Sequence, residues 1–186
     1  QAEHPPYGTN LTKALGHYVR LHQTSGSSGG APMRWLDSPD NWQWWKKLWG
    51  IIYTAAGVTR QDRMFFPFSF GPFVGFWAAF ESAVALGNLS LSAGGMTTSA
   101  RLRFMCDNGC TVVCCTPTYA LRMAEVAAQE GKNADAVRYY EAYLKYAPAD
   151  GGLLVGSVQR IGRSAARSAG CCGASDHGRR SVCRGR

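Results

Sequence analysis

The sequence predicts an α/β fold in which a mostly parallel sheet is flanked by helices. Three short strand patterns, at residues 63–68, 88–92 and 111–115, alternate with helical patterns along the chain. Apolar strands separated by helices are typical of a parallel sheet that is covered on both faces, with right-handed crossovers. The chain has 186 residues, 46% of them hydrophobic, which is enough for a core. Its apolar runs fall well short of the ~18 residues that a membrane-spanning helix needs.

The first helix is predicted from its two ends. Ser38 followed by Pro39 is typical of a helix start, with a side-chain cap and a proline at the first helical position. Gly57 is expected to end the helix. Between these ends, large apolar residues recur at helical spacing, which favours one buried stripe over a binding surface. The stripe consists of Trp42, Trp45, Trp49 and Ile52.

Three further helices are predicted at residues 73–86, 98–107 and 116–129. A glycine follows each of the first two, and a Thr-Pro pair opens the third as the Ser-Pro pair opens the first helix. Upstream of these elements, two short strands at residues 18–22 and 33–36 flank a loop rich in glycine and serine.

The chain changes character after residue 131. Residues 132–150 show a helical pattern of uncertain origin, similar to a single tetratricopeptide-type helix pair. Residues 151–186 hold seven Arg, eight Gly and one acidic residue, and they supply most of the net charge of +8. We expect this tail to be disordered, and its loss of pattern favours a shifted reading frame or a truncation artefact. The alternative is a non-enzymatic helical interaction module with a basic tail that binds nucleic acid, but such repeats need stacked neighbours.

The seven cysteines indicate a reducing, cytoplasmic compartment, because they are odd in number and absent from the first 105 residues. Cys106, Cys110 and Cys114 are interpreted as small buried residues. A second group in the tail lacks the paired spacing of a zinc site, so no metal site is predicted. This group consists of Cys171, Cys172, His177 and Cys183.

The loop TSGSSGG, residues 24–30, is the strongest candidate binding element. It offers four hydroxyls, and its glycines allow successive backbone N–H groups to converge, which suits a polyphosphate. It lacks the lysine of a P-loop and precedes a strand rather than a helix, which argues against that class of nucleotide site. By composition alone, a flexible linker is the favoured interpretation of this loop.

Five segments in order resemble the adenylate-forming acid:CoA ligases, and within them the phenylacetate:CoA ligase group. They are LHQTSGSSGGAP, MRWLDSPDNW, AAGVTRQDR, FPFSFGPFVGFWAAFESAVALG and VVCCTPTYALRMAEVA, and the resemblance covers residues 5–130. The resemblance implies that residues 1–131 are part of the N-terminal domain of such an enzyme. It implies that a carboxylic acid, with an aromatic acid expected, attacks the α-phosphate of ATP to give an acyl-adenylate and pyrophosphate. Coenzyme A then takes the acyl group. ATP, Mg²⁺ and coenzyme A are therefore the expected co-substrates, without a membrane or a specific nucleic acid as partner.

The resemblance also assigns two sets of site residues, whereas the catalytic residues stay unknown. The set that matches the phosphate-binding loop is Thr24, Ser25, Gly26, Ser27, Ser28 and Gly29. The set that matches the acyl-binding segments is Phe70, Gly71, Phe73 and Tyr119. From the residues alone, an ordinary core is the favoured interpretation of the two phenylalanines, and only with the resemblance are core and pocket wall equally supported. The segment that begins at Thr116 also fits an ordinary helix cap.

The sequence departs from the family pattern in two places. Gly30 and Ala31 separate the loop from Pro32, and the lysine often found near this position is missing. The downstream Tyr-Gly-x-Thr-Glu segment, the ribose-binding Asp and the adenylation Lys have no counterpart. We therefore expect a fragment that does not turn over ATP alone and whose sheet has an exposed edge.

Overall fold

The computed structural model describes residues 1–26, 29–130 and 157–160. Within them the chain alternates between short strands and helices, after a 3-10 turn at Leu15–His17. The helices are α1 (Pro39–Ala55), α2 (Val74–Ala85), α3 (Thr98–Asp107) and α4 (Pro117–Gln129). The strands are β1 (Arg20–Gln23), β2 (Arg34–Asp37), β3 (Arg63–Phe66), β4 (Leu89–Ser92), β5 (Val112–Cys115) and β6 (Ser157–Arg160).

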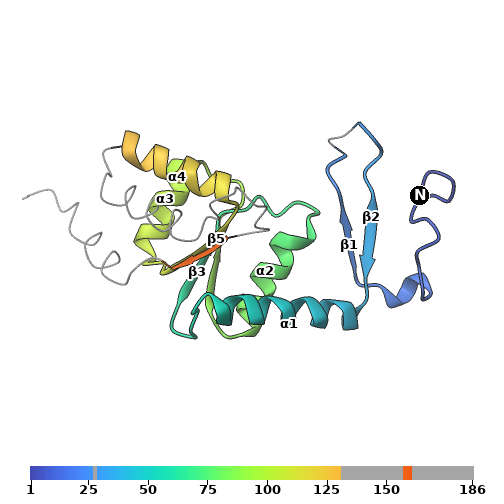
Figure 1. Ribbon diagram of the computed structural model, residues 1–186. Helices are drawn as coiled ribbons and strands as arrows, with labels where there is room; N and C mark the ends of the chain where they lie inside the picture. Colours follow the sequence, from blue (N-terminus) through green and yellow to red (C-terminus); the bar gives the residue numbers. More distant parts are fainter. Residues whose placement is uncertain (27–28, 131–156, 161–186) are drawn as a thin grey trace, which may run out of the picture.

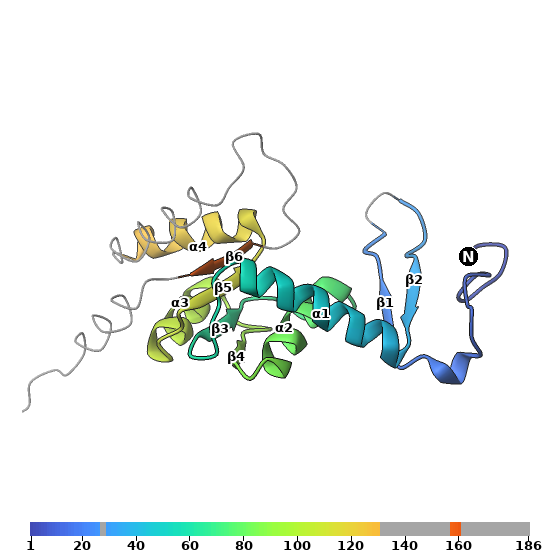
Figure 2. The same ribbon diagram turned by 60° about the horizontal axis from the view of Figure 1, so that its bottom comes forward.

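The main sheet has the strand order β4-β3-β5-β6, and it confirms the predicted α/β class. Strands β4, β3 and β5 run parallel, with Phe65 of β3 opposite Leu91 on one side and Val113 on the other. Helices α1 and α2 pack together on one side of these strands, and α3 and α4 lie on the other (Figure 1, Figure 2). The chain leaves β3 through α2 toward one neighbour and returns through α3 toward the other, which places the two helices on opposite faces.

The core lies between β3 and the helices. Met64, Phe65 and Phe66 of β3 are fully buried, because a central parallel strand has no face toward solvent. On α1, the buried stripe differs from the prediction at one position: Ile52 is 42% exposed, whereas Tyr53 is 1% exposed. At 3.6 residues per turn, Tyr53 lies close to the line of the buried tryptophans, whereas Ile52 points about 80° away from it.

Helix caps and glycines fix the ends of these elements. The side chain of Ser38 accepts a hydrogen bond from the backbone N–H of Asn41, as predicted from the Ser-Pro pair. Gly57, Gly87 and Gly109, which follow α1, α2 and α3, have φ angles of 71°, 84° and 56°. Glycine adopts this left-handed backbone without steric cost, which explains why the predicted and observed helix ends agree.

A buried polar cluster fixes the amino ends of the parallel strands. Asp62 is 1% exposed and accepts hydrogen bonds from the backbone N–H of Thr59 at 2.7 Å and the hydroxyl of Thr111 at 2.9 Å. The Thr111 hydroxyl in turn accepts from the backbone N–H of Arg63 at 3.0 Å. At the amino ends of the strands, which we call the amino edge, the polar groups therefore bond to one another. This leaves the carboxyl ends of the strands as the place for a ligand.

The cysteines between residues 106 and 115 are free thiols. Cys110, Cys114 and Cys115 are buried, which confirms that they pack as small apolar residues, whereas Cys106 is half-buried. Burial raises the pKa of the Cys110 and Cys115 thiols to about 12, so they are uncharged near neutral pH.

The region after residue 130 is described only at β6. Four residues that were expected to be disordered, Ser157–Arg160, pair antiparallel with β5 and cover its outer side. Strand β4 forms the other edge, where Leu89 is 60% exposed. The helical pattern at 132–150, the rest of the tail and its cysteines and histidine lie outside the described residues. In the described part of the chain, no helix has the length and apolar character needed to cross a bilayer.

Candidate functional site

The predicted acyl-binding residues follow the carboxyl ends of the parallel strands. Because β3, β4 and β5 run in one direction, the segments after them emerge at the same edge of the sheet. We call this the carboxyl edge, and it consists of residues 67–73, 93–97 and 116–119. In α/β sheets, ligands bind outside this edge.

Phe70 is held in an unusual backbone conformation at the carboxyl edge. Its φ angle is 47°, in the left-handed region that non-glycine residues seldom adopt. Its ring makes edge contacts with Trp77 at 5.0 Å and Phe80 at 5.4 Å between centroids. The indole N–H of Trp77 donates to the carbonyl of Gly71 at 3.0 Å, so α2 contacts both the strained residue and the residue after it. Such strain is characteristic of functional sites.

Gly71 and Phe73 complete this turn, and of the two only Phe73 is exposed. A side chain on Gly71 would approach the Phe73 ring to 3.1 Å, so the absence of a Cβ lets the ring fold back over the backbone. Phe73 is 37% exposed and makes an edge contact with Phe76 at 5.8 Å. Phe70 is therefore mostly part of the packed aromatic cluster, whereas the Phe73 ring is partly exposed to solvent.

The loop after β1 is the tip of a two-stranded hairpin that projects away from the main sheet (Figure 1). Thr24 closes the hairpin: its backbone N–H donates to the carbonyl of Met33, and its hydroxyl accepts from the Met33 N–H, both at 2.9 Å. Gly26 has a φ angle of 68°, and a Cβ there would lie 2.9 Å from the Gly30 carbonyl. Ser25 is exposed, and Ser27 and Ser28 lie outside the described residues.

A backbone hydrogen bond joins this hairpin to the carboxyl edge. The backbone N–H of Gln23 donates to the carbonyl of Pro72 at 2.8 Å. Gln23 directly precedes the loop, and Pro72 lies between the predicted acyl-binding residues Gly71 and Phe73. The structure therefore brings together the beginning of the predicted phosphate loop and the predicted acyl-binding turn.

The base of the hairpin is buried against α1 and α2. His22 is 5% exposed and stacks on Trp42 at 5.5 Å, and its Nε2 lies 3.6 Å from a carboxylate oxygen of Asp37. Burial lowers the pKa of His22, and the nearby Asp37 charge partly opposes this effect. Arg20 lies over the Trp42 ring at 4.3 Å and forms an ion pair with Glu81 of α2.

Tyr119, the last predicted acyl-binding residue, lies in the first turn of α4 and contacts α3. Its hydroxyl accepts a hydrogen bond from Nη1 of Arg101 at 2.7 Å and lies 3.2 Å from the hydroxyl of Thr98. Arg101 is 8% exposed, and its Nε donates to the carbonyl of Ala93 at 2.9 Å. Thr116 caps α4 through its hydroxyl, which confirms the helix-cap interpretation of that residue.

Sequence reasoning missed Arg101 and Thr98. The only local signal is that Arg101 falls on the same face of α3 as the buried Leu102 and Met105. Arg103, two positions later, is exposed, and composition does not distinguish these two arginines.

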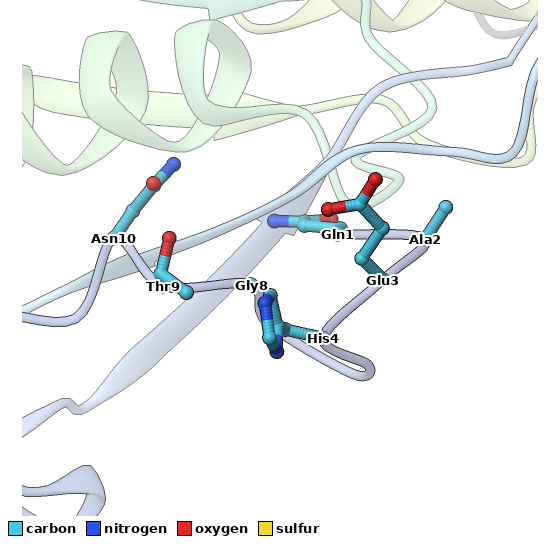
Figure 3. Close-up of a pocket in the computed structure, with 7 residues that line it drawn as sticks. All are labelled: Gln1, Ala2, Glu3, His4, Gly8, Thr9 and Asn10. Carbon is cyan, nitrogen blue, oxygen red and sulfur yellow. The ribbon is translucent and has the colours of Figure 1, made fainter.

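A separate hollow lies at the N-terminus of the chain (Figure 3). It has a volume of about 300 Å³ and a polar lining, and it contains none of the predicted site residues. Its lining consists of Gln1, Ala2, Glu3, His4, Gly8, Thr9 and Asn10. We assign no role in the candidate site to this hollow.

The chain is similar to solved structures of 2-hydroxyisobutyryl-CoA ligase. It matches an open conformation in complex with 2-HIB-AMP and CoA, with a TM-score of 0.62 and 27% identity over 70% of this chain and 30% of that one. A structure in the thioesterification state, also with 2-HIB-AMP and CoA, gives a TM-score of 0.64 and 24% identity, with coverages of 70% and 28%. The chain therefore spans less than a third of the length of these enzymes.

No protein-family model and no curated protein matches the chain. The structural neighbours are acid:CoA ligases crystallised with an acyl-adenylate, which agrees with the resemblance at the level of the superfamily. They act on a small hydroxy acid by name, so they do not support the phenylacetate subgroup or an aromatic substrate.

Proposed function

We propose that residues 1–130 form the phosphate-binding and acyl-binding part of an ATP-dependent acid:CoA ligase. The observation that carries this proposal is the Gln23–Pro72 hydrogen bond, which holds the start of the hydroxyl-rich loop beside residues 67–73 at the carboxyl edge, which we call the aromatic turn. A reaction between ATP and a carboxylic acid needs binding elements for both reactants at one place. The similarity to CoA ligase structures supports the same assignment.

The loop supplies the phosphate-binding groups in this proposal. Hydroxyls and backbone N–H groups donate to phosphate oxygens and stabilise the charge that develops on the pyrophosphate leaving group. Residues 24–30 contain no carboxylate, so Mg²⁺ would reach the loop bound to ATP rather than through ligands of the loop itself. The residues concerned are Thr24, Ser25, Gly26, Ser27, Ser28 and Gly29.

The aromatic turn and the start of α4 supply the acyl-binding groups. Phe73 is the exposed ring, Phe70 and Gly71 hold the turn in place, and Tyr119 lies across the carboxyl edge from them. Apolar walls with a few polar groups suit an aromatic acid such as phenylacetate. Coenzyme A would then accept the acyl group, as in the enzymes that the chain resembles.

The alternative function, an interaction module with a nucleic-acid-binding tail, depends on residues 132–186. Apart from β6, these residues lie outside the described part of the chain. The similarity to CoA ligases covers 70% of the chain and does not favour this alternative.

Titration of the folded chain with Mg·ATP tests the proposal. Two glycine variants of the loop are compared, one that strains the backbone and one that does not. Gly26→Ala places a Cβ against the Gly30 carbonyl at a positive φ angle, whereas a Cβ on Gly30 meets nothing within 4 Å. We expect saturable binding by the wild type and by Gly30→Ala, and at least about tenfold weaker binding by Gly26→Ala.

Two outcomes contradict the proposal. One is the absence of Mg·ATP binding by a chain that circular dichroism and cooperative unfolding show to be folded. The other is equal affinity in the two glycine variants, because binding would then not depend on the conformation of the loop.

A further inference from the structure

Arg101 is a buried cation without a carboxylate partner among the described residues. It is 8% exposed, and none of the ion pairs formed by the described side chains includes it. Its partners are the neutral carbonyl of Ala93 and the neutral hydroxyl of Tyr119, with the guanidinium carbon 5.2 Å from the centre of the Tyr119 ring. A charge removed from water without a counter-charge is unfavourable, so the surroundings of Arg101 favour the arrival of an anion.

The hydrogen bonds around Arg101 leave a hydroxyl proton available. A guanidinium only donates, so the Tyr119 oxygen accepts from Arg101. The Tyr119 and Thr98 hydroxyls are 3.2 Å apart, and either can donate to the other. In both arrangements one of the two hydroxyl protons stays free for a third group. Arg101, Tyr119 and Thr98, which we call the donor cluster, therefore present a positive charge and a hydroxyl donor together.

The donor cluster lies at the carboxyl edge, beside the aromatic turn. Ala93, whose carbonyl binds Arg101, directly follows β4, and a Cβ on the next residue, Gly94, would lie 3.9 Å from the Phe70 ring. Thr98 and Tyr119 lie in the first turns of α3 and α4, where helix dipoles also favour negative charge. The charge, the donors and the dipoles therefore all favour the same kind of ligand.

We propose that Arg101 is a positioning residue that holds the Tyr119 hydroxyl and makes the carboxyl edge select an oxyanion over its neutral analogue. The oxyanion is either the carboxylate of the acid substrate or a phosphate of the nucleotide. Only this identification of the ligand rests on the proposed function. Selection between charged and neutral ligands is a property of the donor cluster itself.

Binding titrations with matched pairs of ligands test the proposal. One arm compares phenylacetate with phenylacetamide and 2-hydroxyisobutyrate with its amide, and the other compares AMP with adenosine. In the wild type we expect at least one anion to bind at least about tenfold more tightly than its neutral partner. In Arg101→Met the ratio should fall toward one, through weaker binding of the anion with unchanged binding of the neutral partner.

Variants of neighbouring residues separate positioning from simple structural loss. Arg101→Lys keeps a positive charge and should restore part of the preference, and Tyr119→Phe keeps the ring but should lower the preference as Arg101→Met does. Arg103→Met, an exposed arginine of the same helix, is the matched control and should leave the ratio unchanged. If Arg101→Met fails to fold, Tyr119→Phe and Thr98→Val carry the test.

The outcome of each arm is decisive. If Arg101→Met loses the anion preference only in the acid pairs, the carboxylate is the ligand of the donor cluster. If it loses the preference only for AMP over adenosine, the phosphate is that ligand. An unchanged ratio in folded Arg101→Met, or a wild type that prefers neither anion, overturns the proposal. Failure of Mg·ATP binding together with a preserved acid preference contradicts the ligase function and leaves the role of Arg101 standing.

Discussion

Tyr53 joins two helices of the core through one buried hydroxyl. It is 1% exposed on α1, and its hydroxyl donates to the carbonyl of Ala79 on α2 at 2.7 Å. Burial raises the pKa of this hydroxyl far above its usual range, so the group stays protonated and continues to donate. At the residue scale, therefore, this buried hydroxyl is stabilised by a specific partner.

Removal of this hydroxyl provides the first prediction. We expect Tyr53→Phe to lower the free energy of unfolding by about 1–2 kcal/mol, because one buried hydrogen bond between α1 and α2 is lost. Urea unfolding followed by tryptophan fluorescence measures the change, with Tyr7→Phe, outside the core, as the control. Equal stability of Tyr53→Phe and the wild type would contradict the role assigned to this bond.

His22 predicts a pH dependence of stability. Burial holds the pKa of His22 in the folded chain below the ordinary value of 6.5. As the pH falls toward and below about 6.5, the unfolded chain therefore binds the proton more readily than the folded chain. The free energy of unfolding should therefore fall as the pH drops from about 7.5 to about 5.5, and stay constant above about 7.5.

A substitution isolates this effect. His22→Gln stays neutral over the whole range and should show a flatter pH profile, whereas His17→Gln, an exposed histidine, should keep the profile of the wild type. Unfolding curves at several pH values measure the slopes. A His22→Gln profile as steep as that of the wild type would show that another group is responsible.

At the scale of elements, the hairpin that carries the loop is held by few contacts with the rest of the fold. Glu81 of α2 accepts from the Trp42 indole N–H at 2.6 Å and forms an ion pair with Arg20 of β1. The Glu81 and Arg20 side chains are 27% and 31% exposed, so the pair is only partly screened by water. Glu81 therefore connects α1, α2 and the hairpin.

Loss of this carboxylate should loosen the hairpin more than the sheet. We expect Glu81→Ala to speed amide hydrogen exchange of β1 and β2 several-fold while β3 and β5 keep their protection. Glu125→Ala, which removes an exposed pair with Arg122, is the control and should change neither. Equal acceleration in the hairpin and the sheet would mean that Glu81 acts on the stability of the whole chain instead.

Most elements could be predicted because their signals are local. Caps and glycines mark the helix ends in the sequence, and the observed caps at Ser38 and Thr116 are the residues that the pattern indicates. Signals that depend on packing were missed. Ile52 is apolar but lies at the margin of the buried face of α1, and β6 pairs with β5 across a gap of 41 residues between them.

At the scale of the whole molecule, the two edges of the parallel sheet differ in what their polar groups do. At the amino edge, Asp62 and Thr111 form hydrogen bonds with their own neighbours. At the carboxyl edge, Arg101 has neutral partners, Phe70 is strained and Phe73 is exposed. The identity of the loop and of the aromatic turn could be proposed from resemblance, but their contact depends on the Gln23–Pro72 bond, which sequence spacing does not reveal.

Hydrogen exchange measured by mass spectrometry with and without Mg·ATP is the most direct test of the central claim, that the loop and the carboxyl edge form one site. We predict that the nucleotide protects amides of the hairpin at residues 20–34 and of the aromatic turn at residues 67–73 together. Residues 59–63 at the amino edge should not change. Protection of the hairpin without the aromatic turn, or of neither segment, would contradict the claim.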